Sequence, residues 1–561
     1  MNMIRFRTTP LAAFVLFAAS AFTAHARAAG ADDFYGTTEP FASEAIYFVM
    51  TDRFVNGDRS NDHRDQGGKD PALRTFDRPV ADANGANIGY LGGDFKGIVD
   101  NAGYIRGMGF TSVWVTPIVD NPDQAFSGGS LIGSDALFKD QGKTGYHGYW
   151  GTDFYKLDEH LPSAGLDFAG FTRAMKDNKL DVVLDIVGNH GSPAYSMPKM
   201  QPQYGKVYDR DGKLVADHQN LDPARLDPAH KRIHAFYNTG GGLAQLSDFN
   251  ENNPAVLEYL VGAYEQWIDQ GAAAFRVDTI AWMPHSFWKK FADRIRAKRP
   301  GFFMFGEAFN YDAALIAGHT LDRNGHFSVL DFPMRGKMAA TFEKKGSDFA
   351  DLATALYLED GPYANPYDLV TFYDNHDMAR MNATDEGFID ANNWLFTARG
   401  IPAVYYGSET GFMRGRAEHM GNRNYYGQER VDAAGKSPIY PALKRIASLR
   451  RESPALQRGL QLNLSMKGDE AAFYRVYEHA GVTQTALVLL NKGDAAREVM
   501  LADYLQAGQW RDAFSGKPVK VGKRLGMEVP AHGVRVLFFD RPLTRADLRA
   551  RLADSMTRKD R

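Results

Sequence analysis

The sequence contains no cysteine among its 561 residues, so neither a disulfide framework nor a thiolate metal site can form. Its formal net charge is only −3, which gives no reason to expect nucleic acid or an anionic membrane as a partner. Beyond the N-terminal segment, no apolar run approaches the length of a transmembrane helix. The remainder is ordinary globular sequence, 44% hydrophobic and 12% aromatic. Its stability must come from its core and from any hard cations that it binds.

The N-terminal segment, residues 1–28, has the pattern of a bacterial secretory signal peptide. Arg5 and Arg7 precede an apolar run over residues 11–22, and small residues suited to cleavage follow the run. The run is short for a membrane span. The sequence therefore predicts a periplasmic or secreted protein whose mature form is not inserted in a membrane.

Four short blocks each combine an apolar strand-like half with a polar end. They cover residues 181–190, 273–280, 302–309 and 370–377. The apolar halves are typical of strands covered on both faces. In a (β/α)₈ barrel the active site lies where such strands end, so the polar halves are expected to meet there. Carboxylates together with His and Arg, without Cys, indicate glycosidic chemistry.

The order of expected elements places these blocks in a parallel sheet of the α/β class. Strands at residues 45–50, 111–115 and 181–187 alternate with helices at residues 95–108 and 168–178. Further helices are expected at residues 257–269, 286–298 and 440–451, and a late strand at residues 404–407. The expected domains are a barrel (45–190 and 248–455), an inserted irregular subdomain (191–247), a C-terminal antiparallel β-sandwich (456–541) and a charged tail (542–561).

In this order, the four blocks resemble the α-amylase superfamily, glycoside hydrolase family 13, over residues 45–541. Residues 145–150 (GYHGYW) and 246–250 (LSDFN) agree with the resemblance. Residues 51–54 (TDRF) and 92–94 (GGD) look most like cyclodextrin glycosyltransferases and related bacterial α-amylases. The resemblance implies a (β/α)₈ barrel with a subdomain inserted after strand 3 and a C-terminal antiparallel β-domain.

The resemblance also implies roles for three carboxylates: Asp278 as nucleophile, Glu307 as acid/base and Asp377 as the residue that binds sugar hydroxyls. A retaining mechanism needs one ionised and one protonated carboxyl group. Arg276 lies two residues before Asp278 on the same strand face, and its fixed charge would favour the ionised nucleophile. The apolar run before Glu307 is a setting that could raise its pKa.

The residues expected to bind substrate come from the same segments. They are His147, Tyr149, Asp185, His190, Arg276 and His376. Each also has a structural interpretation: Asp185 could serve only to orient Arg276, and Tyr149 and His376 could simply pack in the core.

Two calcium sites are expected from the resemblance, because Ca²⁺ prefers carboxylate, amide and carbonyl oxygens. The first uses a short loop together with the GGD segment: Asn56, Asp58, Asn61, Asp62, Gly92 and Asp94. A solvated turn is the alternative for this loop. The second joins the barrel to the subdomain through Asn189, Asp248 and the backbone carbonyl of Trp282, where the family normally has His.

Two departures from the family favour hydrolysis over cyclisation. Ala281 and Trp282 replace a common Lys-His pair, and Ala244 stands where cyclising members have an aromatic residue. We expect a monomeric α-amylase that gives linear products from α-1,4-glucans. The alternatives are a cyclomaltodextrinase or transglycosylating relative, including a cyclodextrin glycosyltransferase, and, more remotely, a non-catalytic carbohydrate-binding homologue. The last would be expected to lack one of the carboxylates.

Overall fold

A computed structural model describes residues 33–66, 75–76, 87–130 and 140–559. Residues Phe34–Arg561 form one compact unit. The expected signal peptide lies outside the described residues. Within them, no helix has the length and apolar character needed to cross a membrane.

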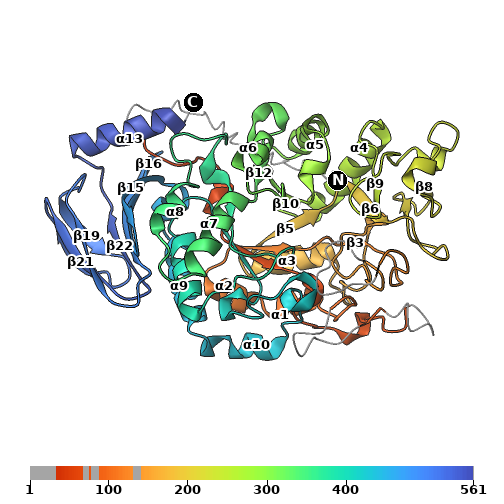
Figure 1. Cartoon of the computed structure of the whole chain (residues 1–561), viewed down its shortest axis with the longest axis horizontal. Coiled ribbons are helices and arrows are strands. Elements are labelled where there is room, and N and C mark those ends of the chain that lie inside the picture. The colour runs from red at the N-terminus through yellow and green to blue at the C-terminus, as the bar shows by residue number, and fades with distance from the viewer. Residues whose placement is uncertain (1–32, 67–74, 77–86, 131–139, 560–561) are drawn as a thin grey trace, which may run out of the picture. The chain divides into compact units, whose positions relative to one another are not determined.

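The centre of the molecule is a ring of parallel strands (Figure 1). Its strands in chain order are β1 (Ile46–Val49), β2 (Ser112–Val115), β5 (Asp181–Ile186), β10 (Ala274–Val277), β11 (Phe303–Gly306), β12 (Ser328–Val329), β13 (Val370–Thr371) and β14 (Ile401–Tyr405). The spatial order is β12-β11-β10-β5-β2-β1-β14-β13, and a parallel bridge from Leu330 to Val370 joins the two ends. The expected (β/α)₈ barrel is therefore confirmed.

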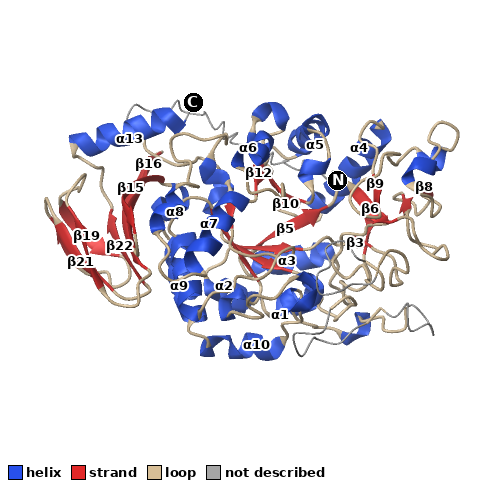
Figure 2. Ribbon diagram, viewed as in Figure 1, coloured by secondary structure: helices blue, strands red, loops and turns tan. Residues whose placement is uncertain are grey.

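Helices surround the ring and cover its outer face (Figure 2). They are α1 (Phe95–Asp100), α2 (Ala102–Met108), α3 (Phe168–Asp177), α4 (Pro254–Asp269), α5 (His285–Lys298), α6 (Ala313–Ile316), α7 (Phe332–Phe342), α8 (Phe349–Ala353), α9 (Asp385–Leu395), α10 (Gln428–Ala433), α11 (Ile439–Arg451) and α12 (Pro454–Arg458). Because helices cover one face and side chains fill the other, nearly every residue of the barrel strands is buried.

An irregular subdomain interrupts the barrel between β5 and β10, its third and fourth strands. It contains β6 (His190–Pro193), β7 (Lys206–Tyr208), β8 (Leu214–Asp217) and β9 (Leu246–Asp248). Strand β6 pairs with β9, and His190 lies opposite Asp248 at the base of the insertion. A separate hairpin of β3 (Val119–Asp120) and β4 (Asp153–Leu157) precedes β5. The insertion after strand 3 is confirmed.

The C-terminal region forms an antiparallel domain. Its strands are β15 (Leu460–Lys467), β16 (Glu470–His479), β17 (Val482–Asn491), β18 (Arg497–Leu501), β19 (Gly508–Asp512), β20 (Pro518–Val521), β21 (Leu525–Val529) and β22 (Gly533–Phe539). They form one six-stranded and one two-stranded sheet. The charged tail forms α13 (Ala546–Lys559), whose Leu548 and Leu552 are fully buried against this domain (Figure 1).

Several elements differ from the sequence prediction, and helices α7 and α9 were not predicted at all. The helix expected at residues 95–108 is two helices, because Asn101 ends α1 and begins α2. The late strand lies at Ile401–Tyr405 rather than at residues 404–407. Strand β12 was not predicted, since two residues give no readable pattern.

Candidate active site

One buried arginine gathers the candidate catalytic carboxylates at the C-terminal ends of the barrel strands. The Arg276 side chain is 0% exposed. Its Nη1 lies 2.8 Å from both Asp185 Oδ1 and Asp278 Oδ1. Its Nη2 lies 3.0 Å from Glu307 Oε2 and 4.0 Å from Asp377 Oδ2. The three candidate catalytic groups therefore surround a single fixed positive charge.

Asp185 lies behind this arginine rather than at the cavity wall. Its Oδ2 accepts hydrogen bonds from Tyr149 Oη (2.9 Å) and Trp114 Nε1 (3.0 Å), while Oδ1 accepts from Arg276. These bonds use both oxygens of a fully buried side chain. Asp185 and Arg276 are both fully buried and are not among the residues that line the cavity, so their direct contact with substrate stays a prediction.

Glu307 lies in a setting that favours its protonated form. Burial, together with the negative charges of Asp377 and Asp278, raises its pKa well above the ordinary value, although Arg276 acts in the opposite direction. The backbone N–H of Thr279 donates to Glu307 Oε2 at 3.2 Å. Thr279 has a φ of 47°, which is unusual for a β-branched residue, and such backbone strain is often found at functional sites.

Asp377 lies in the opposite electrostatic setting. His376 Nε2 lies 3.2 Å from its Oδ2, and Arg423 Nη2 lies 2.7 Å from its Oδ1. Burial alone would raise the pKa of Asp377, but His376, Arg423 and Arg276 together lower it to about 2. The environments of Glu307 and Asp377 therefore shift their pKa values in opposite directions.

These groups face a cavity of about 410 Å³, a size typical of small-molecule sites. Four expected substrate-binding residues line it: His147, Tyr149, His190 and His376. The Tyr149 ring stacks on the His376 ring, with centroids 5.3 Å apart. Burial lowers the pKa of His376 to about 3, so this ring is neutral.

His147 is prepared to donate a hydrogen bond. Its Nδ1 accepts the backbone N–H of Tyr149 at 3.0 Å, so the neutral ring carries its proton on Nε2. Burial lowers the pKa of His147 well below the ordinary value. Within the described part of the chain, His147 Nε2 is buried without a partner. A ligand hydroxyl in the cavity would satisfy it.

Several cavity residues were not predicted from the sequence. Arg423 bridges Asp377 and Glu418, with its Nη2 2.8 Å from Glu418 Oε1. Lys143 pairs with Asp140 at 2.7 Å on the same wall. The further lining residues not predicted as binding residues are Trp150, Leu243, Leu246, Thr279, Phe309 and His419.

The position expected to lack an aromatic ring does lie at the cavity. Ala244 lines it, with a φ of 52°. The nearby aromatic residues Phe236 and Tyr237 are buried, 7% and 1% exposed, and both pack on Phe249 in the subdomain core. Neither of these rings therefore substitutes for Ala244 at the cavity wall.

The first expected calcium site has the features of a cation site. Asn56 Nδ2 donates to Asp62 Oδ1 at 2.6 Å. A Cβ on Gly92 would lie 2.3 Å and 2.6 Å from these same two atoms, so the loop and the Gly92 backbone meet closely. The Oδ1 atoms of Asn56 and Asn61 are buried without a partner among the described residues. Unpaired buried oxygens fit a hard cation.

Two other residues of this site differ in their arrangement. Asp94 accepts the backbone N–H groups of Gly57, Asp58 and Gly97, and caps α1. The Asp58 side chain accepts from Ser60 N and Ser60 Oγ at 3.0 and 2.6 Å. Asp58 Oδ1 thereby caps the turn Arg59–Asn61, and the role of Asp58 as a side-chain ligand stays a prediction.

At the second expected calcium site, Asn189 and Asp248 lie together at the base of the subdomain. The Phe249 N–H donates to the Asn189 carbonyl at 2.9 Å, and Asp248 Oδ2 accepts from Asn238 Nδ2 at 2.9 Å. Trp282 lies in the turn Ile280–Trp282 that follows Asp278. The contribution of its carbonyl remains a prediction.

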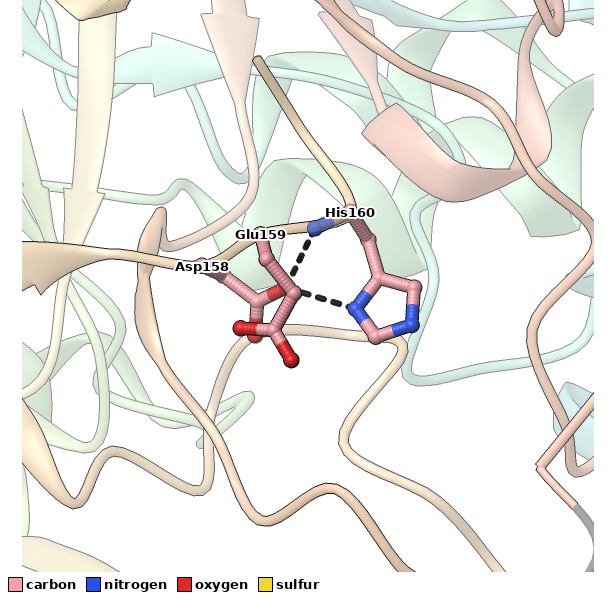
Figure 3. A group of neighbouring side chains, drawn as sticks. All are labelled: Asp158, Glu159 and His160. Atoms are coloured by element: carbon pink, nitrogen blue, oxygen red, sulfur yellow. Dashed lines mark hydrogen bonds and ion pairs between the residues drawn. The ribbon is translucent and has the colours of Figure 1, made fainter. Parts of the chain in front are cut away.

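A further cluster of acidic and imidazole groups lies on the loop after β4. Ligand atoms of Asp158, Glu159 and His160 lie within 4.8 Å of one another (Figure 3). Asp158 Oδ1 lies 3.0 Å from His160 N and 2.8 Å from His160 Nδ1. The other ring nitrogen of His160 lies on the far side of the ring (Figure 3). These internal bonds order the loop, and we assign the cluster no ligand.

Carboxyl groups whose pKa values are shifted in opposite directions face a cavity of this size. This combination defines the class of protein: an enzyme that acts on glycosidic bonds. Comparison with known proteins makes this specific. The family model described as "Alpha amylase, catalytic domain" matches residues 48–437. The chain therefore belongs to the α-amylase family, glycoside hydrolase family 13.

The curated relatives include both cyclomaltodextrin glucanotransferases and an alpha-amylase. The chain is 30% identical over 501 residues to a cyclomaltodextrin glucanotransferase of Klebsiella oxytoca, covering 81% of this chain and 71% of that one. It is also 30% identical over 530 residues to an alpha-amylase of Niallia circulans, covering 91% and 93%. The chain spans 64% of the length of the Thermoanaerobacterium thermosulfurigenes glucanotransferase.

The similar solved structures also include both kinds of enzyme. One similar structure is a cyclomaltodextrin glucanotransferase with a three-domain ABC distribution, at TM-score 0.72 and 29% identity, covering 89% of this chain and 99% of that one. Another is the alpha-amylase of Geobacillus thermoleovorans complexed with acarbose, at TM-score 0.67 and 26% identity, covering 89% and 98%.

Proposed function

We propose that this protein is a periplasmic or secreted α-amylase that hydrolyses α-1,4-glucosidic bonds with retention. The supporting observation is that Arg276 contacts both Asp278 and Glu307, while burial raises the pKa of Glu307. A retaining enzyme needs two nearby carboxyl groups in different protonation states. Export rests on residues 1–28, which lie outside the described part.

In the first step, the Asp278 carboxylate attacks C1 of the sugar. The bond from C1 to the leaving oxygen breaks, and the Glu307 proton passes to that oxygen. In the second step, Glu307 removes a proton from water, whose oxygen attacks C1 and releases Asp278. Asp377 stays ionised and accepts hydrogen bonds from sugar hydroxyls, and His147 Nε2 donates to them.

Two alternatives remain within the family. A cyclomaltodextrinase or a transglycosylating relative, including a cyclodextrin glycosyltransferase, would use the same three carboxylates. Ala244 at the cavity wall favours linear products, since a methyl group gives a curling chain little surface. A non-catalytic carbohydrate-binding role is disfavoured because Asp278, Glu307 and Asp377 are all present.

Product analysis tests the proposal. The protein would be incubated with soluble starch, cyclodextrins and pullulan, with the anomeric form followed by NMR. Linear maltooligosaccharides released first in the α form are expected. An initial β product would contradict retention, and cyclodextrins as the dominant early product would favour the cyclising alternative.

We also propose that Ca²⁺ binds the loop of Asn56, Asp58, Asn61 and Asp62 with the Gly92 carbonyl and Asp94. A second ion would bind at Asn189, Asp248 and the Trp282 carbonyl. The ion would supply structural cross-linking there. Because an ion bound only to the native state stabilises it by mass action, a chelator should lower the melting temperature and calcium should restore it. An unchanged melt in chelator, with no metal found by elemental analysis, would count against both sites.

A further inference from the structure

The glycine before the acid/base residue lies in close contact with a buried isoleucine. Gly306 ends strand β11, directly before Glu307. A Cβ on Gly306 would lie 2.6 Å from Ile280 Cδ1, 2.7 Å from its Cγ2 and 3.0 Å from its Cβ. Ile280 is fully buried at the start of the turn Ile280–Trp282, and its carbonyl accepts a hydrogen bond from Trp288 Nε1 at 2.8 Å. No side chain larger than hydrogen therefore fits at position 306 unless Ile280 moves.

The backbone beside this contact fixes one oxygen of the Glu307 carboxyl group. The Ile280 N–H donates to the Glu307 carbonyl at 3.1 Å. The Thr279 N–H donates to Glu307 Oε2 at 3.2 Å, and Arg276 Nη2 lies 3.0 Å from the same oxygen. Because Oε2 faces a hydrogen-bond donor and a positive charge, the proton of the acid belongs on Oε1.

Thr279 makes its bond only by adopting a left-handed backbone conformation. Its φ is 47° and its ψ is 37°. A β-branched residue rarely has this conformation, which persists only where the surroundings enforce it. The next residue is Ile280, whose side chain lies against Gly306. The contact between strand and turn therefore keeps the Thr279 N–H directed at the acid.

We propose that Gly306 and Ile280 are positioning residues, whose close contact sets the Thr279 N–H on Glu307 Oε2 so that Oε1 presents the proton to the leaving oxygen. The inference rests on the proposed role of Glu307 as acid, and it names the parts of the chain that direct that acid.

The chemistry of the proposed reaction then runs through one oxygen of Glu307. In the first step the Oε1 proton passes to the leaving oxygen, which keeps the electron pair of its broken bond to C1, while Asp278 bonds to C1. In the second step Oε1 takes the proton of the attacking water, and the electron pair of the broken bond to C1 returns to Asp278.

Gly306→Ala tests the contact between strand and turn. Gly306 has no left-handed φ, so alanine suits its backbone and the added methyl group acts by crowding Ile280. We expect kcat/KM on starch to fall by about 10- to 100-fold, because acid catalysis depends on accurate placement. The loss on α-maltosyl fluoride should be much smaller, since fluoride leaves without a proton.

The pH profile separates a positioning role from general damage. Burial raises the pKa of Glu307, whereas the Thr279 N–H bond lowers it. Loss of this bond should therefore move the alkaline limb of kcat/KM on starch upward by about 0.5–1 pH unit. Arg276, Asp278 and Asp377 also face this carboxyl group and are unchanged in the variant. A merely structural defect would lower the rate without moving the limb.

A double-mutant cycle tests the coupling of the two residues. Ile280→Ala alone should move the limb in the same direction as Gly306→Ala, because the turn loses its support. In the double variant the added methyl group occupies space that the isoleucine side chain leaves, so rate and limb should return toward wild type. Gly435→Ala is the matched control and should equal the wild type, because a Cβ on Gly435 meets nothing within 4 Å.

A wild-type starch rate and an unmoved limb in Gly306→Ala would overturn the inference, as would losses that simply add in the double variant. If Gly306→Ala fails to fold, Ile280→Ala carries the test, since it crowds nothing, and an unmoved limb there would overturn the inference equally. A wild-type protein that cleaves neither starch nor α-maltosyl fluoride would instead overturn the proposed function.

Discussion

Glu307 is the residue whose replacement separates proton donation from bond cleavage. Glu307→Gln keeps the shape of the side chain but removes the acid, so kcat/KM on starch should fall by about 10²–10⁴-fold. The loss should be smaller on α-maltosyl fluoride, because fluoride leaves without a proton. Glu258→Gln, on the exposed surface of α4, is the control and should change neither rate. Equal losses on both substrates would contradict the assignment of Glu307 as acid.

Residues that follow directly on a strand could be predicted from the sequence. Asp278 and Glu307 each follow directly on an apolar strand, so the barrel rule alone places them together at one end of the ring. Asp377 lies in the loop after β13, beyond the end of that strand. Arg423 and His419 could not be predicted, because they lie in an irregular segment after β14 where no strand or helix period places a side chain. Asp185 was ambiguous, since sequence does not distinguish a cavity wall from the layer behind it.

Among the elements, the turn at Gly92 is sensitive to a single added methyl group. Gly92 has a φ of 90°, and a Cβ there would lie 2.3 Å from Asn56 Nδ2. Gly92→Ala should therefore lower the free energy of unfolding by at least about 1–2 kcal/mol, the left-handed penalty alone. Urea denaturation measures this loss.

Gly103→Ala is the matched control for this substitution. Gly103 lies within α2, and a Cβ there meets nothing within 4 Å. Alanine is the better helix former by about 0.8–1.0 kcal/mol, so this variant should be as stable as the wild type or more stable. Equal destabilisation of both variants would contradict this explanation, because an added methyl group would then be no worse in the Gly92 turn than in the helix.

Some long elements followed the sequence closely, although the 11-residue helices α7 and α9 were not predicted. Helices α4 and α5 carry enough turns for their apolar period to be recognised, and both lie close to the predicted ranges. Strand β12 pairs through Ser328 and Val329 only, so its place in the ring depends on neighbours distant in the sequence. The expected helix at residues 95–108 contains a break at Asn101 that a hydrophobic period does not reveal.

At the scale of the whole molecule, His532 links the antiparallel domain to the barrel. Its Nδ1 lies 2.7 Å from Asp390 Oδ2 on α9, and its Nε2 lies 3.1 Å from Asp494 Oδ1. The hydrogen bond to Asp390 and the nearby charges raise the pKa of His532 to about 9, although burial opposes this. The His532 contribution is therefore full near its unfolded pKa of about 6.5 and is lost as pH rises through about 9. Below about pH 6 the pair weakens again, because burial raises the pKa of Asp390 to about 6.

The prediction is that His532→Gln lowers the urea midpoint near pH 6.5, and that the difference from wild type disappears by about pH 10. His230→Gln is the control, because His230 forms a similar 2.9 Å contact with Asp227 but is 83% exposed. An exposed pair contributes little, so this variant should match the wild type at both pH values. A difference for His532→Gln that stays constant with pH would refute the charge-based explanation.

Native folding also changes how many protons the chain carries. In the unfolded chain the Glu307 carboxyl ionises near its ordinary pKa of 4.5, whereas burial keeps it protonated to higher pH in the native protein. Folding therefore takes up a proton in this window, and the free energy of unfolding falls as pH rises through it, by about 1.4 kcal/mol per pKa unit. Calorimetric unfolding in two buffers of different ionisation enthalpy should detect the released protons, and Glu307→Gln should reduce their number, with His532, Asp185 and Asp390 still contributing. Folding thus protonates the catalytic acid before any sugar binds, and the contribution of this one group to stability rises in the same pH range in which the acid is ready to act.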